Sequence, residues 1–253
     1  MTWPIVTIAV GLTAFTAAIV PASAEQRHHW SYSGEGGPSH WAELDAKNAA
    51  CGGGKSQSPV NIRTQDVRRT SLPKLMFNYR SAPLHIIDNG HSVQINVEPG
   101  SILKVGDKRY ELVQFHFHHP SEELINGKRS EMVVHLVHRA TPGKLAVVAV
   151  LLEAGQPNAT VKALWSHLPK QKEHEVEFKD VVINPAGLLP KDRRYFTYTG
   201  SLTTPPCSEG VRWLVLRSPS TLSKDELAVF AKLYPNDARP VQKLNGRQVL
   251  GTK

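Results

Sequence analysis

The residues best suited to chemistry lie in one short stretch of the chain. VQFHFHHP (113–120) places three histidines within four positions, in a protein of 253 residues that has 12 histidines. Alternating apolar and polar residues predict a β-strand here. Side chains two positions apart on a strand share a face, so we expect His116 and His118 to project together, beside Gln114. Two imidazoles at this spacing can bind a metal ion, although hydrogen-bonded core histidines would give the same pattern.

A third metal ligand is available in the stretch VVHLVH (133–138). His135 and His138 would point to opposite faces of a strand, so alternation alone leaves both open. Three neutral imidazoles with a free fourth position form a catalytic zinc site, whereas closed structural sites usually use cysteines. Only Cys51 and Cys207 are present, and we expect them to be joined to each other. The pattern therefore favours a catalytic metal site over a structural one.

The first 24 residues predict a secretory signal peptide. They contain no charged side chain and end in Ala22-Ser23-Ala24, an A-x-A site after an apolar run. No Lys or Arg precedes that run, so an uncleaved anchor is the alternative. Cleavage after Ala24 would leave one domain over 25–253, in the periplasm or secreted. Two cysteines in an oxidising compartment predict a disulfide between Cys51 and Cys207, with two unrelated buried thiols as the alternative.

Elements that could position these histidines are mostly strands, separated by Asn-Gly and Pro-Gly turns. Two helices are also expected, at 160–168 and at 223–234, the latter opening with Ser223 and Glu226 in capping-box spacing. We predict a mainly β (α+β) single domain around a large, twisted, mostly antiparallel sheet, with short peripheral helices. The strand-like segments are SVQINV (92–97), YELVQFHFH (110–118), MVVHLVH (132–138), LAVVAVLL (145–152) and VRWLVLR (211–217).

Composition excludes some functions. The chain is 40% hydrophobic and 21% charged, as in ordinary globular proteins. The formal net charge is +8, and all of it falls after residue 24. Lys and Arg are scattered and no nucleic-acid-binding module occurs, so we expect no nucleic-acid partner. We interpret the charge as solvated surface that mildly attracts small anions.

Several long motifs resemble the α-class carbonic anhydrases. These are QFHFHHPSE, VVHLVH, GSLTTPPCSEGVRW and QSPVNI. The similarity runs in order from 28–38 to 239–249, nearly the whole chain after the signal. It implies a single domain around a twisted, mostly antiparallel sheet, with zinc at the bottom of a conical active-site cleft.

The resemblance also implies which histidines bind the metal. His116, His118 and His135 match the Zn²⁺ ligands, whereas His119 and His138 match positions that do not bind it. The implied reaction is the reversible hydration of carbon dioxide to bicarbonate and a proton, through attack by zinc hydroxide.

The remaining site residues are also assigned by resemblance. Thr203 would orient the nucleophile by donating its single hydroxyl hydrogen to Glu122, and His91 would be the proton shuttle. Thr204 would contact bicarbonate, and a disulfide at Cys207 would hold the loop that carries Thr203. The substrate wall would comprise Val137, Val147, Leu202, Val211 and Trp213. Gln114, Tyr32, Asn89 and Gln94 would support the ligands and order the water of the cleft.

Two positions depart from the family's usual pattern. The family usually has Glu two residues before the third ligand, hydrogen-bonded to that imidazole, and this chain has Val133 there. It usually has His directly after the gatekeeping Glu, and this chain has Glu123. Loss of such a partner costs about 10–100-fold in metal affinity or activity. We hypothesise that Glu123 or a water replaces it as the partner of His135.

Three functions follow from these observations. The first is an exported zinc lyase acting on carbon dioxide and bicarbonate. The second is a non-catalytic carbonic-anhydrase-like binding module, which the presence of all three histidines disfavours. The third, ester hydrolysis, is expected only as a side activity. Related exported bacterial enzymes suggest a homodimer, and no stable membrane insertion is expected after signal cleavage.

Overall fold

Strands make up most of the regular structure. The computed structural model describes Met1 and residues 29–253, so the predicted signal peptide lies, apart from Met1, outside the described residues. The strands are β1 (Asn61–Ile62), β2 (Arg68–Thr70), β3 (Leu75–Asn78), β4 (Ala82–Asp88), β5 (Val93–Asn96), β6 (Ile102–Val105), β7 (Lys108–His118), β8 (Leu124–Ile125), β9 (Met132–Ala140), β10 (Lys144–Ala154), β11 (Val176–Ile183), β12 (Tyr195–Ser201), β13 (Glu209–Leu216), β14 (Ser220–Leu222) and β15 (Leu250–Thr252). The helices are α1 (Trp41–Leu44), α2 (Ala49–Gly53), α3 (Ala159–Trp165) and α4 (Lys224–Leu233), with 3₁₀ turns η1 (Gly34–Gly36), η2 (Ala46–Asn48) and η3 (Pro185–Leu188).

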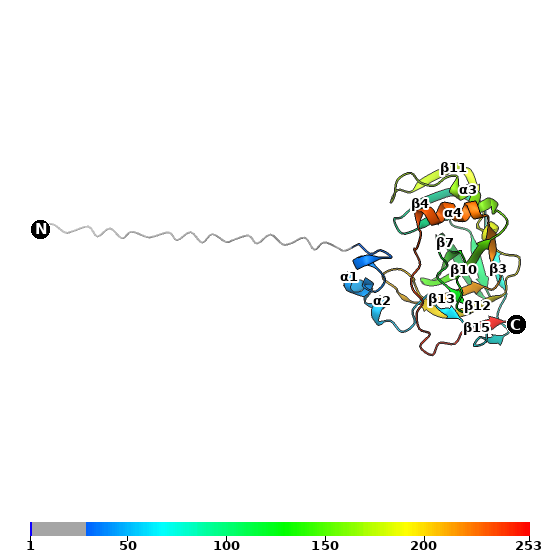
Figure 1. Ribbon diagram of the computed structural model, residues 1–253, viewed down its shortest axis with the longest axis horizontal. Helices are drawn as coiled ribbons and strands as arrows, with labels where there is room; N and C mark the ends of the chain where they lie inside the picture. The colour runs from blue at the N-terminus through cyan, green and yellow to red at the C-terminus, as the bar shows by residue number, and fades with distance from the viewer. Residues whose placement is uncertain (2–28) are drawn as a thin grey trace.

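One large sheet organises the domain (Figure 1). Its main path runs β11-β4-β5-β7-β9-β10-β13-β12-β15-β2. Most neighbours are antiparallel, while β10 pairs in parallel with β13 and with β14, and β15 with β2. Strands β1 and β8 form a separate parallel pair. The predicted mainly β single domain around a mostly antiparallel sheet is therefore confirmed.

The central strands carry side chains into two different cores. In β7, Phe115 and Phe117 are fully buried on one face, where they join the larger hydrophobic cluster. Neighbouring β9 contributes Val133 and Val137 to a second cluster on the other face. Because both faces of these strands are covered, β9 is buried without alternation from Met132 to His138. His116 and His118 of β7 and His135 of β9 lie on the face of the second core, whereas His138 lies on the face of the first.

Both predicted helices are present and pack outside the sheet (Figure 1). Helix α4 begins with the predicted capping box, in which Ser223 Oγ accepts from the Glu226 backbone N–H and the Glu226 carboxylate accepts from the Ser223 N–H. Phe230 of this helix is buried against Phe117, with ring centroids 6.0 Å apart. Helix α4 thus supports the back of the strand that carries His116 and His118.

The predicted disulfide is formed and ties the N-terminal segment to the sheet. Cys51 in α2 is bonded to Cys207, which lies in the loop between β12 and β13. Both cysteines pack against the fully buried Trp41. Since Thr203 lies in the same loop, the bond restrains the segment as the sequence predicted.

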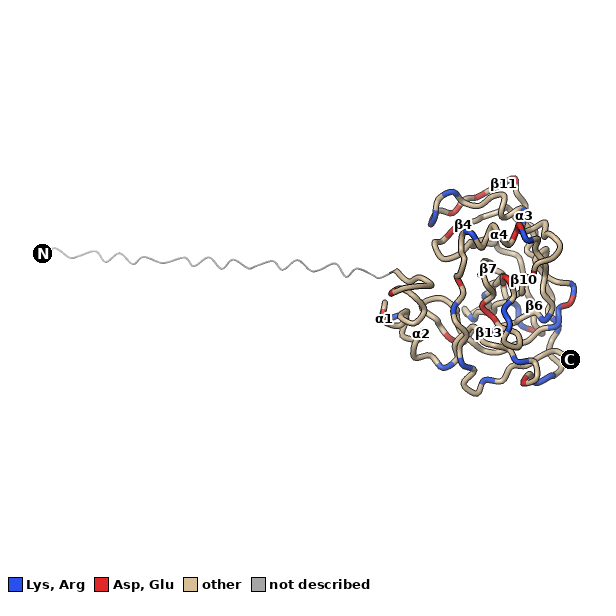
Figure 2. The backbone as a smooth tube through the Cα atoms, viewed as in Figure 1, with Lys and Arg blue, Asp and Glu red and all other residues tan. Residues whose placement is uncertain are grey.

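Charged residues are dispersed over the domain. Figure 2 shows Lys and Arg dispersed over the domain and interspersed with Asp and Glu. This distribution agrees with the interpretation of the net charge as solvated surface. In the part of the chain that the structure describes, no helix has both the length and the hydropathy needed to cross a membrane.

Removing the disulfide should destabilise the domain. The bond closes a loop of 156 residues, for which the chain-entropy model gives a ceiling of about 5 kcal/mol. We expect the double variant Cys51→Ala/Cys207→Ala to lose about 2–5 kcal/mol of unfolding free energy in urea denaturation. Reductant should lower the stability of the wild type and leave that of the variant unchanged. Equal unfolding free energies for the double variant and the wild type without reductant would contradict the prediction.

Candidate metal centre

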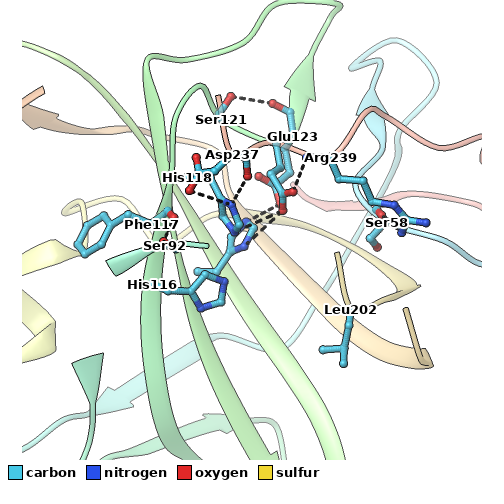
Figure 3. A network of polar contacts seen from close by, with 12 residues as sticks. Ser58, Ser92, His116, Phe117, His118, Ser121, Glu123, Leu202, Asp237 and Arg239 are labelled. Atoms are coloured by element: carbon cyan, nitrogen blue, oxygen red, sulfur yellow. Dashed lines mark hydrogen bonds and ion pairs between the residues drawn. The ribbon is translucent and has the colours of Figure 1, made fainter. Parts of the chain in front are cut away.

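Three imidazoles converge where β7 and β9 lie side by side. His116 and His118 project from β7, and the antiparallel register places His135 of β9 directly opposite His116. One nitrogen from each ring lies within 4.8 Å of the others. Figure 3 shows His116 and His118 on the same side of β7, with Phe117 directed away from them. The shared strand face predicted for His116 and His118 is confirmed.

The second nitrogen of each ring already has a hydrogen-bond acceptor. His116 Nδ1 lies 2.8 Å from Gln114 Oε1, the partner predicted for it. His118 Nδ1 lies 2.8 Å from the backbone oxygen of Asp237. These acceptors hold a proton on Nδ1, so Nε2 of both rings keeps its lone pair.

His135 is oriented the opposite way. Its Nε2 lies 3.0 Å from Glu123 Oε1, which leaves Nδ1 free to face the other two rings. This contact supports the hypothesis that Glu123 replaces the hydrogen-bond partner of His135 that is missing at Val133.

The three free nitrogens fit a zinc ion. His118 and His135 are each 1% exposed, and His118 Nε2 has no hydrogen-bond partner within the described residues. A buried polar nitrogen without a partner is costly, and a cation at this point would satisfy it. Burial, together with the two neighbouring imidazoles, holds the pKa of His116 well below its usual value, so its ring is neutral as a ligand must be. The donor set is that of a catalytic zinc site with an open position.

His138 and His119 lie apart from this group. His138 is fully buried, and its Nε2 lies 2.7 Å from Tyr79 Oη. His119 directs Nδ1 to the backbone oxygen of Pro235, 3.0 Å away. Strand alternation had left His135 and His138 open as the third ligand, and the register of β7 with β9 selects His135.

Glu122 lies beside the free nitrogens. Its Oε1 accepts a hydrogen bond from the backbone N–H of Arg239 at 2.8 Å. Its Oε2 lies 3.6 Å from His118 Nε2 and 3.8 Å from His135 Nδ1. Burial alone would lower the pKa of His118, but Glu122 and Asp237 outweigh it and raise that pKa. Glu122 thus supplies negative charge where a cation would be held.

Thr203 does not make its expected contact with Glu122. The residue is buried directly after β12, but Glu122 Oε2 has no hydrogen-bond partner among the residues described. The hydroxyl-to-carboxylate bond predicted from the resemblance is therefore not formed in this structure. The Glu122 carboxylate is instead directed toward His118 and His135.

The predicted apolar wall forms one cluster beside the imidazoles. The indole of Trp213 meets the His135 ring edge to face, with centroids 5.0 Å apart. Its N–H donates to the backbone oxygen of Ser201, which fixes the orientation of the ring. Thr204 is partly exposed, next to Thr203. The apolar residues gathered here are Val137, Val147, Leu202, Val211 and Trp213.

His91 lies in a turn bordering β5. Asn89 Oδ1 accepts from the His91 N–H at 3.0 Å, and the Asn89 side-chain amide reaches Gln94 at 3.4 Å. Gln94 pairs in register with His116, so the turn adjoins the metal ligands. The His91 ring stacks on Trp30, with centroids 3.5 Å apart, and on His29 at 4.8 Å. Burial, with His29 and Lys172 nearby, lowers the pKa of His91 to about 4.

Tyr32 lies nearby and contacts the same N-terminal aromatic residues. Its ring meets those of Trp30 and Trp41 edge to face. Its buried hydroxyl has no hydrogen-bond partner within the described part of the chain. Burial, followed by the charge of Glu122, raises its pKa well above the usual value. The hydroxyl is therefore a neutral group suited to binding water.

Sequence reasoning missed three contributors to this site. The backbone oxygen of Asp237 holds His118, but an oxygen that every residue carries leaves no sequence signal. Arg239 is 1% exposed and bonds Gln57, Ser58 and Cys51 as well as Glu122. Figure 3 shows Arg239 between Ser58 and Glu123. The third is Trp30. Its aromatic ring could have suggested a stacking contact, but nothing in the sequence indicated that the partner is His91.

The fold and the site together define a mainly β protein with three converging imidazoles that could hold a metal ion, and comparisons with known proteins show its family. The family model "Eukaryotic-type carbonic anhydrase" matches residues 36–253. A carbonic anhydrase of Nostoc sp. is 41% identical over 241 residues, covering 94% of this chain and 91% of the relative. One from Pectobacterium carotovorum is 40% identical, covering 90% and 93%.

A solved structure gives the same result. The α-carbonic anhydrase from Thermovibrio ammonificans, in complex with the inhibitor sulfanilamide, superposes with a TM-score of 0.85. It is 38% identical, with 88% of this chain and 98% of that chain covered. The chain belongs to the eukaryotic-type, or α-class, carbonic anhydrase family, and it is an enzyme of that family.

Replacing a metal-facing histidine should abolish tight metal binding. Loss of an outer hydrogen-bond partner costs about 10–100-fold in metal affinity. We expect His116→Ala to weaken zinc binding by more than this, because the variant loses a direct ligand. Chelator competition on purified protein measures this affinity. The matched control is His119→Ala, three residues along, which should bind zinc like the wild type. Equal losses in both variants would contradict the assignment.

The stacked position of His91 should be visible in its titration. We expect the His91 pKa to lie near 4 in the wild type, by NMR. In Trp30→Ala it should rise toward the unperturbed value of about 6.5, because the ring regains solvent. His29→Ala should raise it less, since burial is the larger cause. A wild-type pKa near 6.5 would contradict the stacked arrangement.

Proposed function

We propose that this enzyme catalyses the reversible hydration of carbon dioxide to bicarbonate and a proton, with zinc held by His116, His118 and His135. The observation that carries the proposal is the convergence of three free imidazole nitrogens, largely buried, in a member of this family. Zinc at such a site lowers the pKa of a coordinated water to about 7, for which carbonic anhydrases are the standard example.

Thr203 and Glu122 would orient the attacking oxygen. A threonine hydroxyl that donates its hydrogen to a carboxylate can only accept from another donor, which fixes the direction of that donor. Support comes from the buried position of Thr203 and from Glu122 Oε2, which has no hydrogen-bond partner among residues 29–253. Formation of this bond would require the Glu122 carboxylate to turn from His118 and His135 toward Thr203.

The apolar cluster would hold the substrate next to the metal. Carbon dioxide is apolar, and Val137, Val147 and Trp213 offer a dry wall beside His135. Leu202 and Val211 extend this wall, and Thr204 would contact the polar product bicarbonate. The wall would thereby exclude water from one side of the reacting carbon.

His91 would pass the proton to solvent. It lies in the turn next to Gln94, which together with Asn89 and Tyr32 would order water between the ligands and the ring. With a pKa of about 4 in the stack, His91 is a poor proton acceptor at neutral pH. We therefore propose that the ring accepts its proton after leaving the stack on Trp30 and His29.

Further properties follow from the same proposal. The disulfide supports export to the periplasm or the outside of the cell, with residues 1–24 as the signal and 25–253 as the mature domain. Ester hydrolysis is a plausible side activity of the same nucleophile. The homodimer stays a prediction from resemblance. The alternative, a non-catalytic binding module, would hold a ligand without turnover.

Proton release on mixing carbon dioxide with lightly buffered enzyme tests this function. We expect the wild type to acidify the solution rapidly and His135→Ala to have no measurable activity. Thr203→Ala should lose about 10²-fold in kcat, the cost typical of one lost orienting group. Thr199→Ala, an exposed threonine of β12, is the matched control and should keep full activity. A zinc-loaded wild type without turnover would instead support the binding module.

A further inference from the structure

Both departures from the family's usual pattern lie beside one imidazole, that of His135. Val133 is fully buried, two residues before His135 on the same face of β9. It therefore occupies the place on the strand from which a longer side chain could reach the ring. Glu123 reaches the ring from another element, the loop that follows β7, and contacts Nε2 at 3.0 Å. Position 133 therefore has no carboxylate, whereas position 123 has one in contact with the His135 ring.

Glu123 is held firmly in this place. It is 0% exposed, and its backbone oxygen accepts from Ser121 Oγ at 2.9 Å. The next residue, Leu124, begins β8 and donates its N–H to Val60. Within the described residues, His135 is the only hydrogen-bond partner of the Glu123 carboxylate, because Oε2 has none. Nothing else in the described fold uses this buried carboxylate.

We propose that Glu123 is the positioning residue for the third metal ligand, and that Glu123 and Val133 form a compensated exchange of one carboxylate between two elements. A carboxylate can only accept, so it holds the proton on His135 Nε2 and leaves the Nδ1 lone pair free. Its negative charge also makes the imidazole a stronger donor to a cation. This inference rests on the proposed zinc site.

The exchange gives one loop two functions. Glu122 lies near the free nitrogens, with Oε2 3.8 Å from His135 Nδ1, and its neighbour Glu123 holds the opposite side of the same ring. The loop after β7 therefore fixes both the third ligand and the acid beside the metal. A second carboxylate at position 133 would crowd like charges in a buried site, which raises the cost of ionising both.

Zinc affinity in four variants tests the exchange. Chelator competition should show Glu123→Gln weakening zinc binding by about 10–100-fold, because an amide lacks the negative charge and can present either its oxygen or its NH₂ group to His135 Nε2. Val133→Glu alone should not improve binding. The double variant Glu123→Gln/Val133→Glu should recover most of the loss, since the carboxylate returns from the strand. Glu131→Gln, an exposed acid just before β9, is the matched control and should bind like the wild type.

A second readout needs neither zinc nor activity. In the metal-free protein, ¹⁵N NMR should show the wild-type His135 protonated at Nε2, Glu123→Gln as a mixture of tautomers, and the double variant protonated at Nε2 again. Unchanged zinc affinity in Glu123→Gln, or a double variant as weak as that single variant, would overturn the exchange. Failure of the proposed function would look different, as a wild type that binds zinc tightly without hydrating carbon dioxide.

Discussion

The hydrogen bond on the far side of each imidazole is the constraint on which the site depends. Gln114, the Asp237 backbone and Glu123 each accept from one ring, and each thereby decides which nitrogen keeps its lone pair. These three acceptors come from a strand, a C-terminal segment and a loop. Without them the rings could rotate or exchange tautomers, and three nitrogens within 4.8 Å would not all face one point.

The C-terminal segment that carries the Asp237 acceptor is bonded to several other parts of the fold through Arg239. Arg239, two residues after Asp237, donates its backbone N–H to Glu122, and its guanidinium bonds the backbone of Cys51 and Ser58. A single buried cation therefore connects the disulfide, the N-terminal segment and the acid beside the metal ligands. Removing Arg239 from this network would leave the backbone oxygens of Cys51 and Ser58 without a donor in a buried region, which is costly.

The N-terminal segment affects the site through stacking. Trp30 and His29 cover His91, and the resulting burial favours the neutral ring. The same segment places Tyr32 and Trp41 against the disulfide. A part of the chain with little regular structure thus lowers the pKa of His91 in the turn bordering β5.

The sequence by itself determined the local features of this protein. Period-two alternation placed His116 and His118 on one face and the Ser223–Glu226 spacing located helix α4, because these signals depend only on neighbouring residues. The family was identified from several motifs that occur in order along nearly the whole chain. Tertiary structure supplied what alternation could not: strand alternation left His135 and His138 open, the resemblance favoured His135, and the pairing of β7 with β9 places His135 opposite His116. The Asp237 backbone contact and the stacking of Trp30 on His91 had to be seen in three dimensions, and so did the contact of Glu123 with His135, which the sequence offered only as a hypothesis. Each joins segments distant along the chain or an atom common to all residues, so no residue type encodes it.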